Sequence, residues 1–239
     1  MQKLNNEKYR ALITNCILVL LAVTVCAVGF LPQKISPIFG KGGAKPYYSG
    51  SPTANKVSLM FNVYEGAAEV NSILDILSET GVKATFFMGG TFAIKHESVV
   101  RRIALEGHEL GNHGYFHRDH AKLTMADNLH EIRATESVVR DITGVSTRLF
   151  APPSGSFSNV TLSAAEELGY LTVMWSKDTI DWRDSDPQKI FARATKNPKS
   201  GDLILMHPKA VTVSVLKGII EFYRSAGFVL SPVSENLMG

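Results

Sequence analysis

The sequence has little cysteine, little net charge and no repetition. Only two cysteines occur among 239 residues, and both, Cys16 and Cys26, lie in one apolar segment. A structural disulfide and a zinc site built from cysteines are therefore excluded for the rest of the chain. The formal net charge is +3 and the basic residues form no run, so the sequence gives no electrostatic case for nucleic-acid binding.

A long uncharged run near the N-terminus predicts a membrane anchor. Residues 11–31 carry no charged side chain and are rich in Leu, Val, Ile and Ala. A helix of this length spans the roughly 30 Å hydrocarbon core of a bilayer. Positive charge precedes the run, so residues 1–10 are expected in the cytoplasm and the rest of this single-pass protein outside the cell membrane. A cleaved signal peptide is the alternative, although its apolar part is usually only about 7–15 residues long.

The remaining chain divides into a linker and one folded domain. Residues 32–56 contain four prolines, at positions 32, 37, 46 and 52, and keep no apolar period, which predicts an extracytoplasmic linker. From residue 57 to residue 239, β-rich segments alternate with amphipathic ones. Strands are expected at 57–63, 83–88, 109–112, 148–151, 171–176, 202–206 and 228–230, and helices at 67–79, 92–106, 124–143, 158–168, 187–196 and 213–226.

This alternation predicts an α/β fold with a mainly parallel sheet. A domain of this size with seven strands fits an irregular (β/α)7 barrel, preceded here by one N-terminal transmembrane helix. An open doubly wound sheet is the structural alternative.

Polar residues follow the carboxyl ends of the expected strands. They are Asn62, Tyr64 and Glu65 after the first strand, His113 and His117 after the third, Ser154 after the fourth, Asp181 and Trp182 after the fifth, and His207 after the sixth. In a β/α barrel these ends converge on the rim that carries active sites. Two histidines four residues apart can share a cation, although such a pair in an average protein is more often solvated. His207, at the end of an apolar run, could equally be a core histidine.

Several segments together resemble the polysaccharide deacetylase family, also called the NodB-homology domain. The segment from Gly107 to His117 resembles the family's second motif, and the segments 84–88, 175–182 and 201–208 resemble further motifs in the family's order. The resemblance covers about residues 56–233. It implies a metal-dependent hydrolase that removes acetyl groups from a cell-wall or chitin-like polysaccharide, cleaving a non-peptide C–N bond. It also implies a divalent metal cofactor, with zinc the first candidate.

The resemblance assigns roles residue by residue. His113 and His117 resemble the metal-binding histidines, His207 the general acid, and Asp181 the carboxylate that orients it. The first motif departs from the family, because Asn62 and Val63 stand where an Asp-Asp pair, one base and one metal ligand, is expected. Asn cannot accept a proton at neutral pH and Val cannot bind metal. The third motif departs as well, since Ala151 stands in place of an Arg. The chain thus resembles a divergent, membrane-anchored branch with degenerate first and third motifs.

Two functional hypotheses follow. In the first, the chain is a deacetylase with a rebuilt centre, weak or inactive, in which Glu65 replaces the missing third metal ligand; Asp119 is a less favoured substitute. In the second, it is a catalytically dead glycan-binding or scaffold protein of the cell envelope. Trp182, Ser154 and Tyr64 are the candidates for contacting the sugar, with Tyr115 and Phe116 as further aromatic faces. The expected partners are peptidoglycan or a chitin-like polymer, and the membrane through the N-terminal helix.

Overall fold

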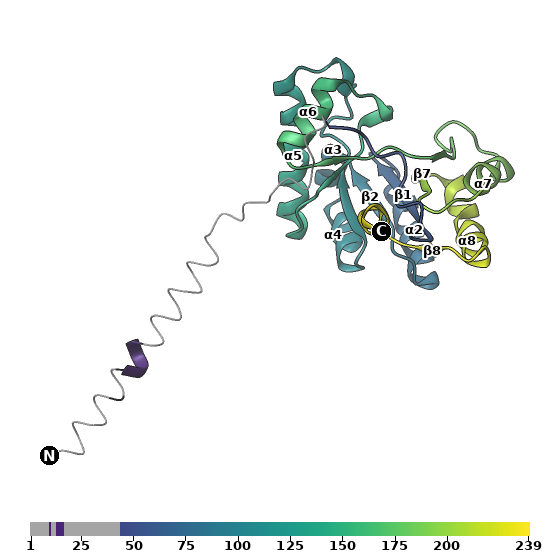
Figure 1. The fold of residues 1–239 in the computed structure, drawn as a ribbon, viewed down its shortest axis with the longest axis horizontal. Coiled ribbons are helices and arrows are strands. Elements are labelled where there is room, and N and C mark those ends of the chain that lie inside the picture. Colours follow the sequence, from purple (N-terminus) through teal and green to yellow (C-terminus); the bar gives the residue numbers. More distant parts are fainter. Residues whose placement is uncertain (1–9, 11–12, 17–43) are drawn as a thin grey trace. The chain divides into compact units, whose positions relative to one another are not determined.

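The computed structural model describes residues 10, 13–16 and 44–239. The predicted transmembrane segment, residues 11–31, therefore lies largely outside the described residues. Among the residues that are described, no helix is both long and apolar enough to cross a membrane. The fold described below is that of residues 44–239 (Figure 1).

Residues 44–239 form a curled sheet of eight parallel strands. The strands are β1 (Lys56–Val63), β2 (Thr85–Met88), β3 (Glu109–Asn112), β4 (Leu149–Phe150), β5 (Leu171–Thr172), β6 (Lys177–Asp178), β7 (Leu203–Met206) and β8 (Val229–Leu230). Their order is β5-β4-β3-β2-β1-β7-β6, and β8 pairs with the start of β1. From β1 to β5 each strand pairs with the next one in the sequence, and β7 pairs with both β1 and β6, so the strands are arranged as in a barrel. Within the described residues β5 and β6 do not pair, which leaves the barrel open between them. The α/β barrel-like architecture is therefore confirmed.

The helices are amphipathic and pack on the outer face of the sheet. They are α2 (Ala67–Thr80), α3 (Gly90–Lys95), α4 (Glu97–Leu105), α5 (Met125–Thr143), α6 (Asn159–Glu167), α7 (Pro187–Thr195) and α8 (Ala210–Ser225), with the short α9 (Val233–Met238) at the C-terminus. In Figure 1, α5 and α6 lie on one side of the strands, and α7 and α8 lie on the other. Local signals fix the helix ends: the Thr124 side chain caps α5, and Gly81, with φ 65°, ends α2 in the left-handed conformation that glycine adopts most readily.

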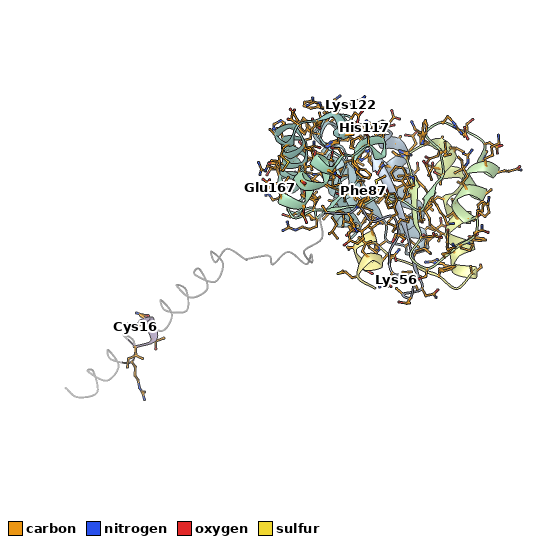
Figure 2. All side chains as sticks on the ribbon, turned by 45° about the horizontal axis from the view of Figure 1, so that its top comes forward. Cys16, Lys56, Phe87, His117, Lys122 and Glu167 are labelled. Atoms are coloured by element: carbon orange, nitrogen blue, oxygen red, sulfur yellow. The ribbon has the colours of Figure 1, made fainter. Side chains whose placement is uncertain are left out.

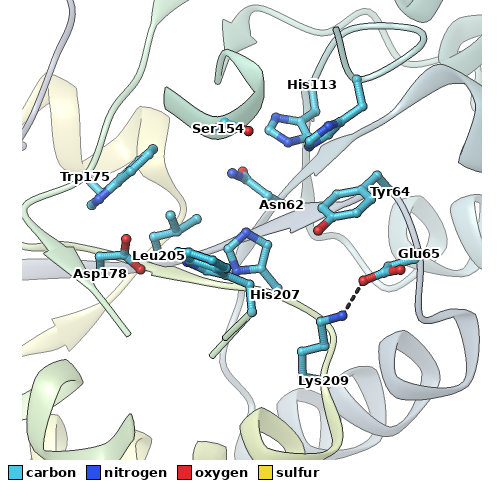
Figure 3. A pocket seen from close by; sticks show the side chains of 12 residues that line it. Asn62, Tyr64, Glu65, His113, Ser154, Trp175, Asp178, Leu205, His207 and Lys209 are labelled. Carbon is cyan, nitrogen blue, oxygen red and sulfur yellow. Dashed lines mark hydrogen bonds and ion pairs between the residues drawn. The ribbon is translucent and has the colours of Figure 1, made fainter. Parts of the chain in front are cut away.

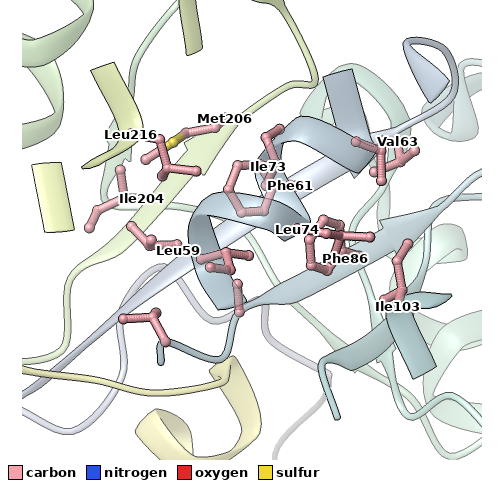
Figure 4. Close-up of a cluster of buried hydrophobic side chains, with 14 of the residues drawn as sticks. Leu59, Phe61, Val63, Ile73, Leu74, Phe86, Ile103, Ile204, Met206 and Leu216 are labelled. Carbon is pink, nitrogen blue, oxygen red and sulfur yellow. The ribbon is translucent and has the colours of Figure 1, made fainter. Parts of the chain in front are cut away.

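Strand β1 separates two apolar cores because successive side chains point to opposite faces of a strand. Leu59, Phe61 and Val63 face the helices in the larger outer core (Figure 4). Met60 faces the barrel interior, where it joins Phe87, Leu149, Ala151, Leu205 and others. Asn62 belongs to this second, inward-facing set, so its side chain enters the barrel at the carboxyl end of β1.

The amino-terminal end of the barrel is closed by α9. Val233 belongs to the inner core, and Asn236 Nδ2 donates to Ser58 Oγ at 3.0 Å. Side chains that enter the interior from this end are thus covered, and the opposite end, formed by the carboxyl ends of the strands, is left for a binding site. His117, close to that opposite end, and Lys56, at the start of β1, lie on opposite sides of the domain in Figure 2.

Two sequence-based expectations need correction. The strand expected at 171–176 is shortened to β5, Leu171–Thr172, and the unpredicted β6 follows it at the opposite edge of the sheet, so the chain crosses the seam between them. Residues 44–55, expected to belong to a linker, pack on the domain instead, since Tyr47 bridges to Val173 and Ser51 N–H donates to the Asn236 carbonyl at 2.8 Å. The folded unit therefore begins before residue 57, and Gly50 lies so close to Asn236 that a side chain there would clash with it.

His108, at the start of β3, should make the fold acid-sensitive. It is 6% exposed, its Nδ1 accepts the Ala84 N–H, and burial lowers its pKa to about 4. A histidine held neutral in the folded state contributes stability that is lost as pH falls from about 6.5 towards 4, because the unfolded chain takes up the proton first. We expect the free energy of unfolding in urea to fall by about 2 to 3 kcal/mol more between pH 7 and pH 4.5 in the wild type than in His108→Gln. Equal losses would contradict this.

Candidate functional site

A pocket of about 390 Å³ opens at the carboxyl ends of the strands (Figure 3). It is lined by Asn62, Tyr64, Glu65, His113, His117, Ser154, Trp175, Asp178, Trp182, Leu205, His207 and Lys209. These residues come from the ends of β1, β3 and β7 and from the loops after β4, β5 and β6. His207 is thereby brought to the same cavity as His113 and His117, about 90 residues earlier in the chain, as expected at this rim of a β/α barrel.

His207 is fixed from behind by a buried carboxylate. Its Nδ1 lies 2.8 Å from Asp181 Oδ1, and its backbone N–H donates to Asp181 Oδ2 at 2.7 Å. The Thr212 hydroxyl donates to the same Oδ2 at 2.5 Å, and Asp181 is only 4% exposed. Because a carboxylate accepts hydrogen bonds, the proton of His207 sits on Nδ1, and Nε2 is left for the pocket. Asp181 itself does not line the pocket but orients the histidine that does.

His113 is oriented in the same way by a carbonyl. Its Nδ1 donates to the Ala151 carbonyl at 2.7 Å, which leaves the lone pair of Nε2 available. Burial, together with the neighbouring His117, holds the pKa of His113 well below its usual range, so the imidazole is neutral near pH 7. Burial also lowers the pKa of His117, whose backbone adopts φ 55° in the left-handed region.

The two histidines have the spacing of a ligand pair, but the site lacks a third ligand. Their ring centroids lie 5.1 Å apart, close to the roughly 5 Å expected when two imidazoles share one tetrahedral cation. Val63 packs in the outer core, and the Glu65 carboxylate is paired with the Lys209 ammonium. No group of three His, Cys, Asp or Glu side chains able to hold a metal occurs in the described part of the chain. The residues present therefore do not fit a complete divalent-metal site, and Glu65 as third ligand is not supported.

Tyr64 is the residue of the β1–α2 loop that faces the histidines. Its ring centroid lies 4.2 Å from that of His117, 6.3 Å from that of His113 and 6.4 Å from that of His207. Its neighbours point elsewhere, Val63 into the outer core and Glu65 towards Lys209. The loop thus presents a phenol to the histidine pair, where a metal site would need a carboxylate.

Asn62 forms the floor of the pocket and carries an unsatisfied oxygen. It is 2% exposed, and its Oδ1 has no hydrogen-bond partner among the described residues. A buried amide oxygen without a partner costs about 1 to 3 kcal/mol, so such groups usually indicate a missing water or ligand. In Figure 3 the Asn62 side chain projects between His113 and His207 into the open space.

The remaining predicted residues lie at the rim or outside. Trp182 lines the pocket with 53% of its surface exposed, and Ser154 lies on its edge with φ 55°. Asp119 pairs with Ser156 and Lys122 and does not line the pocket. Neither Tyr115 nor Phe116 lines it, although Phe116 is 58% exposed.

One residue that supports the site was not predicted. Glu131 of α5 is fully buried, and its Oε2 accepts the N–H groups of Tyr115 at 2.7 Å and Phe116 at 2.8 Å. Those amides belong to the loop between His113 and His117, so this carboxylate fixes the spacing of the two histidines. The available sequence signal was weak: Glu131 lies with Asn128, Ile132 and Thr135 on the buried face of α5, where a carboxylate is unusual.

Glu131→Ala is expected to destabilise the domain and loosen this loop. It removes a fully buried carboxylate and leaves the N–H groups of Tyr115 and Phe116 without their acceptor, which costs about 3 kcal/mol, or a fall in Tm of about 6 to 12 °C. Thermal unfolding followed by circular dichroism measures the change. Glu167→Ala, whose carboxylate is 52% exposed, is the control and should leave Tm nearly unchanged. Equal Tm values for the two variants would refute the role of Glu131.

Comparisons with known proteins agree on one family. A family model described as polysaccharide deacetylase matches residues 49–173. The chain is 36% identical over 191 residues to the uncharacterized protein YlxY of Bacillus subtilis (strain 168), covering 80% of this chain and 60% of that protein. It is 34% identical over 160 residues to a peptidoglycan-N-acetylglucosamine deacetylase of Bacillus cereus, covering 67% of this chain and 58% of that protein. The chain thus spans about three-fifths of these two relatives.

Solved structures show the same fold. A CE4 family pseudoenzyme from Bacillus anthracis superposes with a TM-score of 0.80 at 31% identity, over 82% of this chain and 70% of that one. A mutant of that pseudoenzyme, described as having restored enzymatic activity, has a TM-score of 0.80 at 30% identity, over 82% and 72% of the two chains.

Proposed function

The chain belongs to the polysaccharide deacetylase family, and we propose that its pocket binds an N-acetylated cell-wall glycan, with hydrolysis weak or absent. The observation that carries this proposal is Asn62 on the pocket floor. The family resemblance puts the catalytic base there, and a carboxamide cannot take a proton at neutral pH. The names of the relatives, which include a peptidoglycan deacetylase and a pseudoenzyme, support peptidoglycan as the polymer and loss of turnover as the outcome.

The rest of the pocket suits binding. Its volume of about 390 Å³ lies within the range of small-molecule sites, and Trp182 offers an exposed aromatic face at the rim. Arg183 lies 5.9 Å over the Trp182 ring, which favours an orientation that leaves the other face for a sugar. His207, Asn62 and Ser154 add hydrogen-bonding groups around the cavity.

Residual metal-dependent hydrolysis is the second candidate. It is favoured by the arrangement of His207, Asp181 and Thr212, which keeps the His207 imidazole oriented towards the pocket as a proton carrier would need. The histidine pair could supply two ligands to zinc. A metal, when bound, would polarise the acetyl carbonyl and supply activated water. Against this candidate stand the absence of a base at position 62 and of a carboxylate free to complete the ligand set.

We further propose that residues 11–31 anchor the protein in the cell membrane with residues 44–239 outside. The uncharged run and the positive charge before it support this orientation. An extracytoplasmic domain would face the cell wall, where a peptidoglycan ligand lies.

Binding and turnover of the full-length chain in detergent separate the two candidates. We expect retention on purified peptidoglycan and binding of tetra-N-acetylchitotetraose in calorimetry, both unchanged by EDTA, with no acetate released in the presence of zinc. Asn62→Leu should weaken binding at least about fivefold by removing the floor amide, whereas His130→Ala, an exposed residue of α5, should not. No binding at all would refute the proposal, and acetate release abolished by EDTA would favour residual hydrolysis.

A further inference from the structure

The amino-terminal end of the barrel, opposite the pocket, carries exposed apolar side chains. Leu105, the last residue of α4, is 87% exposed, and Met238, the last residue of α9, is 78% exposed. Val145, in the loop before β4, and Val229, at the start of β8, are exposed as well. All four lie at one end, because the helices of a β/α barrel end where the next strands begin and α9 closes that end. Scattered apolar side chains are common on soluble proteins, so the charges around them decide whether they form an interface.

The same end carries basic side chains that have no acidic partner within the described residues. They lie at the start of β1 or in the loops that lead from a helix to a strand, and none forms an ion pair within residues 44–239: Lys56, Lys83, Arg148, Lys196 and Lys199. The acidic residues of these loops, Glu106 and Asp202, are paired with Arg102 and Lys177. Glu235 of α9 is exposed and reduces the surplus by one charge. A positive surplus therefore surrounds the apolar side chains.

The pocket end differs, because its cations are paired within the protein. Lys209 pairs with Glu65, and Lys122 pairs with Asp119. A cation that already has an acidic partner attracts a further anion only weakly, since the two charges largely cancel at a distance. The two ends of the domain, marked by His117 and Lys56 in Figure 2, thus offer different surfaces. One holds the polar pocket, and the other holds unpaired cations among apolar side chains.

Unpaired cations interspersed with apolar side chains are typical of proteins that bind the surface of a bilayer. Each Lys or Arg close to an anionic lipid surface strengthens binding about fivefold. Apolar side chains such as Leu105 and Met238 gain by entering the boundary between headgroups and acyl chains. A phosphate-bearing polymer of the wall would attract the cations equally but has no apolar phase for these side chains. The combination therefore favours a lipid surface.

The chain also enters the folded domain along this end. The Gly50 N–H donates to the Gly201 carbonyl at 2.7 Å, and the Val229 N–H donates to the Asn55 carbonyl at 3.0 Å. Gly201 precedes β7 and Val229 begins β8, so residues 50–55 run across the amino-terminal end before β1 begins. Residues 32–43, between the uncharged run and the described domain, can span at most about 40 Å. A domain on so short a tether stays close to the bilayer, at a high local concentration, and a few weak contacts are enough to orient it.

We propose that the amino-terminal end of the barrel docks on the anionic lipid surface of the membrane, with Lys56, Lys83, Arg148, Lys196 and Lys199 contacting the headgroups. The pocket, at the opposite end, is then directed away from the bilayer and towards the wall. This proposal rests on the proposed anchor at residues 11–31 and is independent of glycan binding in the pocket. It assigns the membrane a second role, since the anchor holds the domain near the bilayer and the docking surface sets its orientation.

Fluorescence of the full-length chain in vesicles tests the proposal. A polarity-sensitive fluorophore is attached at Met238→Cys in a chain that also carries Cys16→Ser and Cys26→Ser. We expect its emission to shift to the blue in vesicles of equal parts phosphatidylcholine and phosphatidylglycerol but not in phosphatidylcholine alone. The shift should be lost in about 0.5 M NaCl, which screens the charges. The label at Lys122→Cys, a side chain that is 83% exposed and lies on the side of His117 in Figure 2, is the matched control and should not shift.

A pair of charge reversals identifies the surface. Lys83→Glu combined with Lys199→Glu should lower the ratio of docked to undocked domain at least about twentyfold, since each cation is worth about fivefold. Lys122→Glu combined with Lys189→Glu has the same net charge and changes exposed, ion-paired side chains away from this end, so the shift should persist. All four side chains are exposed, so thermal unfolding should be nearly the same in both variants.

The outcomes separate docking from the anchor on which it rests. A chain that floats with the vesicles in high salt, but whose label at position 238 emits alike in both kinds of vesicle, would overturn docking and leave the anchor standing. Equal loss of the shift in the two double variants would overturn the assignment to this end. A blue shift with soluble polyphosphate and none with anionic vesicles would overturn lipid docking in favour of an anionic polymer. A chain that does not float with vesicles at all would overturn both docking and the anchor.

Discussion

The triple variant Asn62→Asp, Val63→Asp, Ala151→Arg is expected to release acetate from tetra-N-acetylchitotetraose in the presence of zinc, where the wild type releases little or none. The first change supplies a carboxylate base on the pocket floor, which is worth roughly 10²- to 10⁴-fold in rate. The second puts a carboxylate where the family resemblance expects the third ligand, and because Val63 packs in the outer core, the end of β1 must turn for this carboxylate to reach the His113–His117 pair. The third gives the new base a cationic partner, which a buried carboxylate needs. Acetate measured by an enzyme-coupled assay should rise at least about a hundredfold.

Single changes and an inactivating fourth change provide the controls. Asn62→Asp alone should remain inactive, because the histidine pair still lacks a third ligand. Adding His207→Ala to the triple variant should abolish the gain. Val63 and Ala151 are both fully buried, so the triple variant should also unfold at a lower temperature than the wild type, and near-UV circular dichroism must establish that it is folded. A folded, zinc-loaded triple variant without turnover would contradict the assignment of the catalytic positions.

Much of the fold could be predicted from the sequence because its strands and helices carry strong local patterns. β1 is an apolar run that ends in polar residues, and α5 has a capping Thr124 at its start and Gly144 after its end. β6 could not be predicted, because Lys177–Asp178 is a two-residue polar strand whose pairing with β7 depends on the curvature of the whole sheet. Nor could the packing of residues 44–55, since their backbone hydrogen bonds join them to Thr172, Met174, Gly201 and Asn236, far along the chain.

The candidate site, like the fold, could be predicted only in part. Motifs at the strand ends predicted that His113, His117 and His207 would meet, and in the structure they line one pocket. The ion pair between Glu65 and Lys209 could not be predicted, since it joins the loop after β1 to the residue before α8, and it removes the carboxylate that the sequence offered as a third ligand. Glu131 was missed because its partners are backbone amides, which leave no trace in the side-chain pattern.

Asp181→Ala is expected to have the largest effect on stability of any single change in the site. Asp181 is 4% exposed and accepts three hydrogen bonds, from the His207 backbone, the His207 ring and the Thr212 hydroxyl. Truncation leaves all three donors buried without an acceptor, at a cost of about 4 kcal/mol, so Tm should fall by about 8 to 16 °C. Asp181→Asn keeps one acceptor oxygen and should lose about half as much, whereas Asp141→Ala, an exposed residue of α5, should lose almost nothing in differential scanning calorimetry. Equal unfolding temperatures for Asp181→Ala and Asp141→Ala would contradict the prediction. The Asp181 carboxylate would then not be the group that orients His207 towards the pocket, and residual hydrolysis, which depends on this orientation, would lose its support.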